Sequence, residues 1–220
     1  NQYIWKIENI PATIEEDYLP PENQIQQAVY FVPEYFKTDS YEGKTTSWDE
    51  YSKWYRRLSA NRYELSAEAK GELFSIISGI TDPKEKIRIL YKHLQKKNRY
   101  VAIEMGLAGW QPQTADQVYK NRYGDCKDLS TYMISMLKFA GINSHPALAR
   151  TRDNGIVNTE QPSNQFNHCI VYVPLEKDTV WLECTSTYDD MEDMPYTIED
   201  IDALVVGDEK GEIIRTPQKS

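Results

Sequence analysis

The sequence has no apolar run that approaches the roughly 20 residues needed to cross a bilayer, so it predicts no membrane span. It also has no excess of positive charge. Its formal net charge of −9 argues against nucleic acid or an anionic membrane surface as a partner, and leaves neutral and cationic substrates open. The remaining composition, 40% hydrophobic and 27% charged, is typical of a globular protein with one good-sized domain and an appendage.

Cysteine and histidine are scarce, with three residues of each. An odd number of cysteines does not form a closed disulfide framework. The sequence has no Cys-x-x-Cys pair or comparable ligand spacing, so a metal site is a weak hypothesis and we expect no cofactor. A phosphate-binding loop, a dinucleotide fingerprint and a Gly-x-Ser-x-Gly elbow are also missing, which argues against the chemistry that those motifs carry.

The N-terminal segment consists of strand-like stretches interrupted by prolines. The alternation of Tyr3, Trp5 and Ile7 predicts one strand, and residues 25–32 predict another. The segment has too little apolar content to fold alone. We therefore expect residues 1–45 to be the end of a preceding β domain with its linker, and residues 46–220 to form a domain of their own. The sequence starts without Met or a signal peptide, so we expect a fragment or a processed chain.

From about residue 47 to residue 141 the apolar spacing is helical, and after that it is typical of strands. The clearest helix starts are Asp82 followed by Pro83, Thr114, and Asp125. The strand patterns cover residues 147–151, 166–173, 180–185, 204–206 and 213–215. Helices followed by strands predict an α+β fold with an antiparallel sheet.

A cysteine stands at the start of the best-defined helix, in Tyr123-Gly124-Asp125-Cys126-Lys127-Asp128. Asp125 is a good N-cap, and Asp128 adds a favourable charge in the first turn. Cys126 then occupies the first helical position, where exposed amides favour a thiolate and can stabilise an oxyanion. A free cysteine on its own is more often a small core residue, so the assignment depends on partners.

Two more residues complete the parts of a thiol active site. His168 begins an apolar strand pattern in Phe166-Asn167-His168, and Glu183 lies in the next one, in Trp181-Leu182-Glu183. Cysteine, histidine and a carboxylate in this order are a nucleophile, its base and the group that orients the base. Taken alone, His168 is more often a core or edge residue, and Glu183 is as often an edge residue that faces water.

The pairing of these two strands decides whether the residues meet. A four-residue connection at residues 174–177 would place His168 directly opposite Glu183 on the same face of the sheet. A five-residue connection would place them on opposite faces. The sequence permits the favourable register but does not force it.

Other candidate residues are weaker. His93 lies in a lysine-rich helical pattern and His145 in a turn before a strand, so we expect structural roles for both. Trp110 and Gln111 precede the cysteine helix, and either side-chain N–H group could donate to an oxyanion. The simpler interpretation of both is a loop that covers the core.

These motifs together resemble the transglutaminase-like superfamily over about residues 48–206. The resemblance rests on Gly124-Asp125-Cys126-Lys127-Asp128, Phe166-Asn167-His168 and Trp181-Leu182-Glu183. More narrowly, the sequence is similar to a bacterial branch of this superfamily in which such a core follows an uncharacterised β-sandwich domain. Residues 1–45 would then be the end of that β-sandwich domain. The resemblance implies a papain-like site with Cys126 as nucleophile and His168 as base. The family usually has Asp where this sequence has Glu183, which is one methylene longer.

The resemblance implies cysteine-dependent acyl transfer at amide bonds. We expect hydrolysis by a peptidase or amidase, because water is always available as acceptor and no feature marks an amine site. One alternative is transglutaminase-type cross-linking. The other is a catalytically weak peptide- or glycan-binding module on the same fold, which Glu183 and the 16 tyrosines keep open. The branch also implies a peptide or protein substrate, cell-wall peptide among the candidates, and export to the periplasm or out of the cell. The sequence does not predict an oligomeric state.

Overall fold

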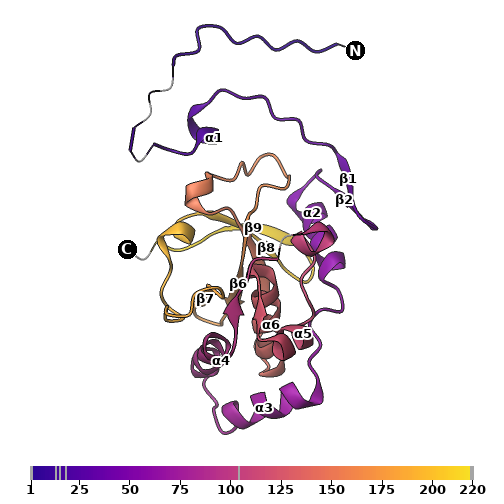
Figure 1. Cartoon of the computed structure of the whole chain (residues 1–220), viewed down its shortest axis with the longest axis vertical. Coiled ribbons are helices and arrows are strands. Elements are labelled where there is room, and N and C mark those ends of the chain that lie inside the picture. The colour runs from indigo at the N-terminus through magenta and orange to yellow at the C-terminus, as the bar shows by residue number, and fades with distance from the viewer. Residues whose placement is uncertain (1, 13, 15, 18, 104, 219–220) are drawn as a thin grey trace.

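The computed structural model describes residues 2–12, 14, 16–17, 19–103 and 105–218. Most of its helices precede its main sheet, which confirms the α+β fold predicted from the sequence (Figure 1). The sheet is antiparallel, with strand order β7-β6-β5-β8-β9. Its strands are β5 (His145–Ala149), β6 (His168–Pro174), β7 (Thr179–Leu182), β8 (Asp202–Val206) and β9 (Gly211–Arg215).

Five helices lie before this sheet, between residues 48 and 139. They are α2 (Trp48–Ser59), α3 (Ala67–Ile77), α4 (Pro83–Lys97), α5 (Ala115–Asn121) and α6 (Cys126–Phe139). The predicted N-caps Asp82, Thr114 and Asp125 are confirmed, since each side chain accepts a backbone amide of the first helical turn. Gly141 follows α6 with φ +78, a left-handed conformation that suits glycine at the end of a helix.

Helix α6 is the centre of the core and packs against β5, β6, α4 and α5. Its predicted apolar face is buried, with Leu129, Met133 and Leu137 at most 2% exposed. These side chains belong to one cluster with Val171 of β6 and Leu182 of β7. Burial of each such side chain contributes about 1.5–3 kcal/mol, so α6 is held firmly on the sheet.

Helix α2 covers another part of the sheet and contacts β8 and β9. It also packs on the hairpin of β1 (Tyr35–Thr38) and β2 (Tyr41–Lys44). The ring of Trp54 meets Phe36 of the hairpin at a centroid distance of 5.1 Å and Trp110 at 5.8 Å, both edge to face. This aromatic cluster fixes the hairpin and the loop around Trp110 on the same helix.

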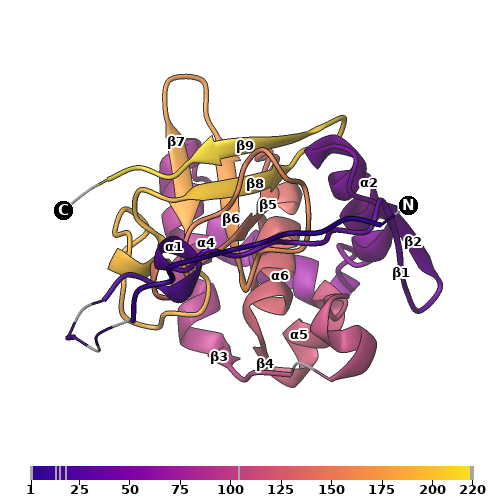
Figure 2. The same cartoon turned by 90° about the horizontal axis from the view of Figure 1, so that it is seen from above.

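The segment before the hairpin contains one short helix, α1 (Glu22–Ile25), and otherwise lacks regular structure in its described residues. Figures 1 and 2 show it running along the outside of the domain. The strand predicted at residues 25–32 is therefore wrong, because no segment of the described chain pairs with its backbone amides. The domain boundary expected at residue 45 stays a prediction. None of the helices in the described part of the chain has both the length and the apolar character to cross a membrane.

Candidate active site

Cys126 is the first residue of α6, as the sequence predicted. The Asp125 side chain accepts the backbone amide of Asp128 at 3.2 Å, and the Asp128 side chain accepts the amide of Asp125 at 3.1 Å. This reciprocal capping box fixes the first turn of the helix. The Cys126 side chain therefore stands beside the free amides of a helix N-terminus, which favour negative charge on a bound oxyanion.

The turn that leads into Cys126 has room only for glycine. A Cβ on Gly124 would lie 2.5 Å from Cβ of Asp128. Gly124 belongs to the short strand β4 (Tyr123–Gly124), which pairs in parallel with β3 (Arg99–Tyr100). The close approach of β4 to the first turn of α6 sets the direction in which the chain enters the helix.

Lys127 is buried directly after the cysteine. Its ammonium group forms an ion pair with the Asp125 carboxylate, and the two side chains are 8% and 1% exposed. Burial raises the pKa of Asp125, and the positive charge of Lys127 opposes that shift. Lys127 also lines the cleft that contains Cys126, so a cation is built into the wall of the site.

Asp128 also holds the loop that precedes α5. Its carboxylate accepts the backbone N–H of Gln113 at 2.7 Å and the side-chain amide of Gln113 at 2.8 Å. One carboxylate therefore joins the first turn of α6 to residues close after Trp110. The position of Trp110 over the cleft depends on this connection and on the aromatic contact with Trp54.

His168 and Glu183 meet, with 2.6 Å between Nε2 of the imidazole and Oε2 of the carboxylate. Both side chains are largely buried, at 15% and 7% exposed. His168 and Cys126 line one cleft, and the interaction with Cys126 contributes to the raised pKa of His168. Since Nε2 is bonded to Glu183, Nδ1 is the ring nitrogen left for Cys126.

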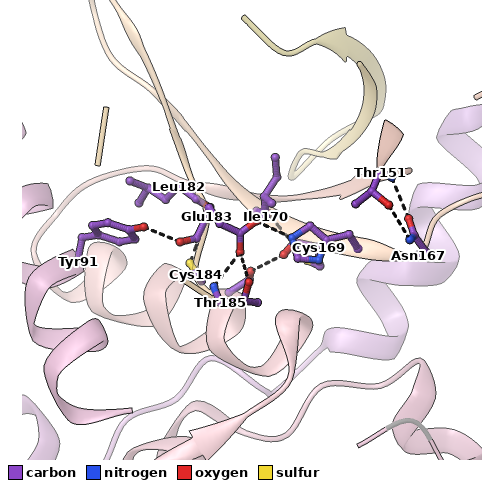
Figure 3. A network of polar contacts seen from close by, with 11 residues as sticks. Tyr91, Thr151, Asn167, Cys169, Ile170, Leu182, Glu183, Cys184 and Thr185 are labelled. Carbon is purple, nitrogen blue, oxygen red and sulfur yellow. Dashed lines mark hydrogen bonds and ion pairs between the residues drawn. The ribbon is translucent and has the colours of Figure 1, made fainter. Parts of the chain in front are cut away.

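Every oxygen of Glu183 is engaged. Oε1 accepts the backbone N–H of Thr185 at 2.8 Å and its hydroxyl at 2.5 Å, while the main-chain oxygen accepts the Tyr91 hydroxyl at 2.6 Å. Figure 3 shows Tyr91 and Thr185 on either side of Glu183. The carboxylate therefore has a single orientation, with Oε2 directed at the imidazole.

The strand register differs by two residues from the one that a connection at residues 174–177 would give. The last pair of the β6–β7 ladder is Pro174 with Thr179, so the connection comprises residues 175–178. The direct opposition of His168 and Glu183, which a connection at residues 174–177 would give, does not occur. Leu182, the last residue of β7, pairs with Val171, and Glu183 follows just beyond the ladder. A shift of two residues keeps both side chains on the same face, where they are diagonal neighbours that a long side chain can bridge.

Hydrogen bonds decide the charges in this group. Burial alone would lower the pKa of His168, but its bonds to Cys126 and Glu183 outweigh burial and raise the pKa to about 10. Burial likewise pushes the pKa of Glu183 upward, but the bonds from His168 and Thr185 prevail and hold it below its ordinary value of 4.5. At neutral pH the pair is an imidazolium and a carboxylate.

Cys126 and His168 open onto a cleft of about 550 Å³. Trp110 lines this cleft, together with Tyr51 and Tyr55 of α2. Gln111, the other expected oxyanion donor, is not among the lining residues, and its side-chain amide donates to the Leu58 carbonyl and the Tyr41 hydroxyl, both at 2.9 Å. The geometry therefore favours Trp110 over Gln111 as a donor to substrate.

The other two histidines lie away from this cleft. His93 of α4 is buried with Nε2 3.9 Å from Glu72, and His145 of β5 has Nδ1 4.0 Å from Asp208. Burial lowers the pKa of both imidazoles, so they are neutral at pH 7. Within the part of the chain that the structure describes, no group of three or more His, Cys, Asp or Glu residues is arranged to hold a metal ion.

A family model for the transglutaminase-like superfamily matches residues 73–186, just over half of the chain. The chain belongs to the transglutaminase-like superfamily. The match covers the cysteine helix, the histidine strand and the glutamate, which is the part of the chain that carries the predicted motifs. A comparison with curated proteins finds no match.

A solved structure shares the fold. A proposed protease from Parabacteroides distasonis ATCC 8503 aligns with a TM-score of 0.57 and 16% identity, over 76% of this chain and 31% of that one. A proposed cysteine protease from Cytophaga hutchinsonii aligns with a TM-score of 0.43 and 14% identity, over 59% of this chain and 41% of that one. This chain therefore spans about a third of the length of the first structure and two fifths of the second.

Sequence reasoning missed several supporting residues. Thr185 follows Glu183 by two positions and orients its carboxylate, and Gln113 ties the Trp110 loop to α6. Neither has a sequence signal beyond its place near a motif. Lys127 does have a sequence signal, namely its position between two aspartates at the start of a helix. Its burial and its ion pair with Asp125 become evident only in the folded structure.

Proposed function

We propose that this domain hydrolyses amide bonds through a cysteine acyl-enzyme, with a peptide or protein as substrate. The observation that carries the proposal is a cleft lined by both Cys126 and His168, in which the His168 ring is hydrogen-bonded to Glu183. A nucleophile, a base and an orienting carboxylate in this order are what acyl transfer requires. Membership of the superfamily is consistent with the same chemistry.

The first half-reaction forms a thioester. Sγ of Cys126, its proton held by His168, attacks the substrate carbonyl carbon, and the carbonyl oxygen gains the negative charge. In this proposal that oxyanion is stabilised by amides at the start of α6 and by the Trp110 side chain, which lines the same cleft as Cys126. The intermediate collapses as the C–N bond breaks, and the His168 imidazolium gives its proton to the leaving amine.

The second half-reaction regenerates the thiol. His168, now neutral, takes a proton from water, and the resulting hydroxide attacks the thioester carbonyl. The C–S bond then breaks, the acid leaves, and the proton on His168 returns to its pairing with the Cys126 sulfur. Glu183 exchanges no proton with substrate in either step; it holds Nε2 and stabilises the imidazolium.

Hydrolysis and amine transfer differ only in the acceptor. Turnover of an internally quenched hexapeptide library, in the presence and absence of monodansylcadaverine, separates the two. We expect cleavage in both conditions and no fluorescent amine in the products. Incorporation of the amine at a rate comparable with cleavage would make the domain a transamidase. Absence of cleavage and of incorporation would favour a binding module on the same fold.

A further inference from the structure

A second cavity continues the catalytic cleft. It has a volume of about 880 Å³ and shares Tyr51, Trp110 and Asn164 with the cleft that holds Cys126. Ligand cavities typically measure about 300–1,000 Å³, so each of the two is large enough to hold part of a ligand. Because the same three side chains line both, the second cavity adjoins the cleft that holds Cys126.

Two segments far apart in the sequence form the walls. One wall is residues 30–33 with the start of the hairpin, and the other is the loop of residues 156–165 between β5 and β6. Figure 1 shows this loop projecting from the sheet toward the N-terminal segment. The first wall lies before residue 73, where the superfamily match begins, so the cavity depends on a part of this chain outside the shared core.

The large exposed side chains of this cavity include three that are apolar. Tyr30, Phe31 and Ile156 are 67%, 74% and 61% exposed, and Phe36 and Trp110 contribute further aromatic surface. Large apolar side chains gathered around one hollow mark a binding surface, whereas single exposed ones carry no such meaning. Here they line one cavity that shares three side chains with the cleft of the candidate active site.

Polar atoms of the loop are used within the protein. The Gln165 side chain accepts the amide of Asn158 at 2.8 Å and donates to the carbonyl oxygens of Asn158 and Gln161 at 3.1 and 2.8 Å. The Thr159 carbonyl accepts Nε1 of Trp48 at 2.7 Å. These hydrogen bonds hold the loop in place. The surfaces that remain for contact with a ligand are mainly aromatic and aliphatic.

Charge adds little to the recognition. Lys37 faces Glu42 at 3.5 Å, and Nε of Arg150 donates to the Asn154 carbonyl at 2.7 Å. One carboxylate, Glu160, lies among the same lining residues. The cavity therefore carries charges of both signs, two of which already have protein partners, and offers a ligand mostly apolar contact.

We propose that this cavity binds the part of a peptide substrate next to the scissile bond and selects a bulky apolar side chain there. The inference rests on the acyl-transfer function proposed above and adds a substrate class to it. Burial of an aromatic or large aliphatic side chain against these rings should favour it over glycine by about tenfold or more in kcat/KM. The gain appears mainly in KM, because these contacts do not involve the reacting bond and are made equally in the ground state and the transition state.

The test measures side-chain preference in three proteins. Internally quenched hexapeptides with Phe, Leu, Asp, Lys or Gly at each position are hydrolysed by wild type, Phe31→Ala and Phe74→Ala. Phe31 and Phe74 are similarly exposed, at 74% and 62%, but Phe74 lies in α3 and does not line the cavity. Because both are largely solvent-exposed, neither substitution should affect folding, and Phe74→Ala is the matched control.

We expect wild type to prefer Phe or Leu at one position, Phe31→Ala to lose about three- to tenfold of that preference through KM, and Phe74→Ala to retain it. An equal preference in wild type and Phe31→Ala would overturn the inference, as would a preference for Asp or Lys. Faster cleavage of a glycopeptide than of its unglycosylated match, with the gain lost in Phe31→Ala, would instead assign the cavity to sugar.

Failure of the proposed function has a separate readout. Alkylation of Cys126 in wild type by iodoacetamide needs no contact with the second cavity. A reactive Cys126 with no apolar preference contradicts the cavity assignment alone. An unreactive Cys126 contradicts the acyl-transfer proposal, and with it the assignment of the cavity to a cleaved substrate.

Discussion

Glu183 directly follows the last residue of β7, and its Oε2 is 2.6 Å from the imidazole Nε2 of His168, the first residue of β6. The carboxylate has no freedom to turn away, because Thr185 donates two hydrogen bonds to its other oxygen. The longer side chain of Glu, where the superfamily resemblance implies Asp, is therefore compatible with a fixed imidazole. The roles of Cys126, His168 and Glu183 can each be tested by substitution.

Cys126→Ala should abolish amide hydrolysis and leave the thermal midpoint within a few degrees of wild type. The Cys126 side chain is only partly buried, and the capping box that fixes the first turn does not involve it. A fully buried cysteine would instead cost about 1 kcal/mol or more on truncation. Measurement of turnover and melting on the same sample checks both parts, and hydrolysis retained by the variant would refute the assignment of the nucleophile.

Glu183→Gln should keep the shape of the site and slow alkylation of Cys126 at neutral pH by about tenfold, because the imidazolium loses its counter-charge. Glu183→Asp keeps the charge but shortens the side chain by about 1.5 Å, so it should fall between wild type and Glu183→Gln. The pH profile of alkylation in the three proteins is the measurement. Identical profiles for wild type and Glu183→Gln would show that Glu183 does not support the imidazolium, and the site would then be at most a Cys126–His168 dyad.

The His168–Glu183 pair should make stability depend on pH in both directions. The pKa of His168 is raised from 6.5 to about 10, so its contribution is complete below 6.5 and is lost as pH rises toward 10. The pKa of Glu183 is lowered from 4.5, so its contribution is complete above 4.5 and is lost as pH falls through the lowered value. The pair therefore contributes most between about pH 4.5 and 6.5.

A double variant, His168→Gln with Glu183→Gln, provides the control because other titrating groups are common to both proteins. The difference in unfolding free energy between wild type and this variant should be largest near pH 5–6. It should shrink by more than about 1.4 kcal/mol, the equivalent of one pKa unit, by pH 10. A difference that does not change with pH would mean that the pair is not ionic.

Gly124→Ala should destabilise the domain by about 1–3 kcal/mol and slow turnover, because its Cβ would collide with Cβ of Asp128 at 2.5 Å. Gly71→Ala is the matched control. It lies inside α3, its added Cβ would meet nothing within 4 Å, and it should stabilise by about 0.5–1 kcal/mol. Chemical denaturation of the two variants should therefore give shifts of opposite sign, and shifts of the same sign would contradict the role assigned to Gly124.

Local signals in the sequence predicted most of the fold. Asp82 with Pro83, Thr114 and Asp125 marked helix starts because capping depends on residues that are adjacent in the chain. The strand register was missed because Pro174 was assigned to the turn, whereas it is the last residue of β6. A proline lacks only its own amide donor, so it can end a ladder without breaking it.

For the candidate site, the sequence predicted the three main residues but not the residues that hold them in place. The order of Cys126, His168 and Glu183 pointed to a common chemistry, since cysteine and histidine have few alternatives in a chain with three of each. The partners that fix them, such as Thr185 and Gln113, depend on side-chain contacts that no local pattern specifies. The second cavity depends on residues 30–33 and 156–165, which only the fold brings together.

The rate of alkylation at Cys126 tests the central claim most directly. Folded protein is treated with iodoacetamide at pH 7, and the three cysteines are followed separately by peptide mapping. Cys169 and Cys184 are internal controls, since they are 3% and 4% exposed and burial raises the pKa of both thiols. We expect Cys126 to react at least tenfold faster than glutathione under the same conditions, with the other two unlabelled until the protein is denatured. A rate at Cys126 no faster than that of glutathione would contradict an activated nucleophile.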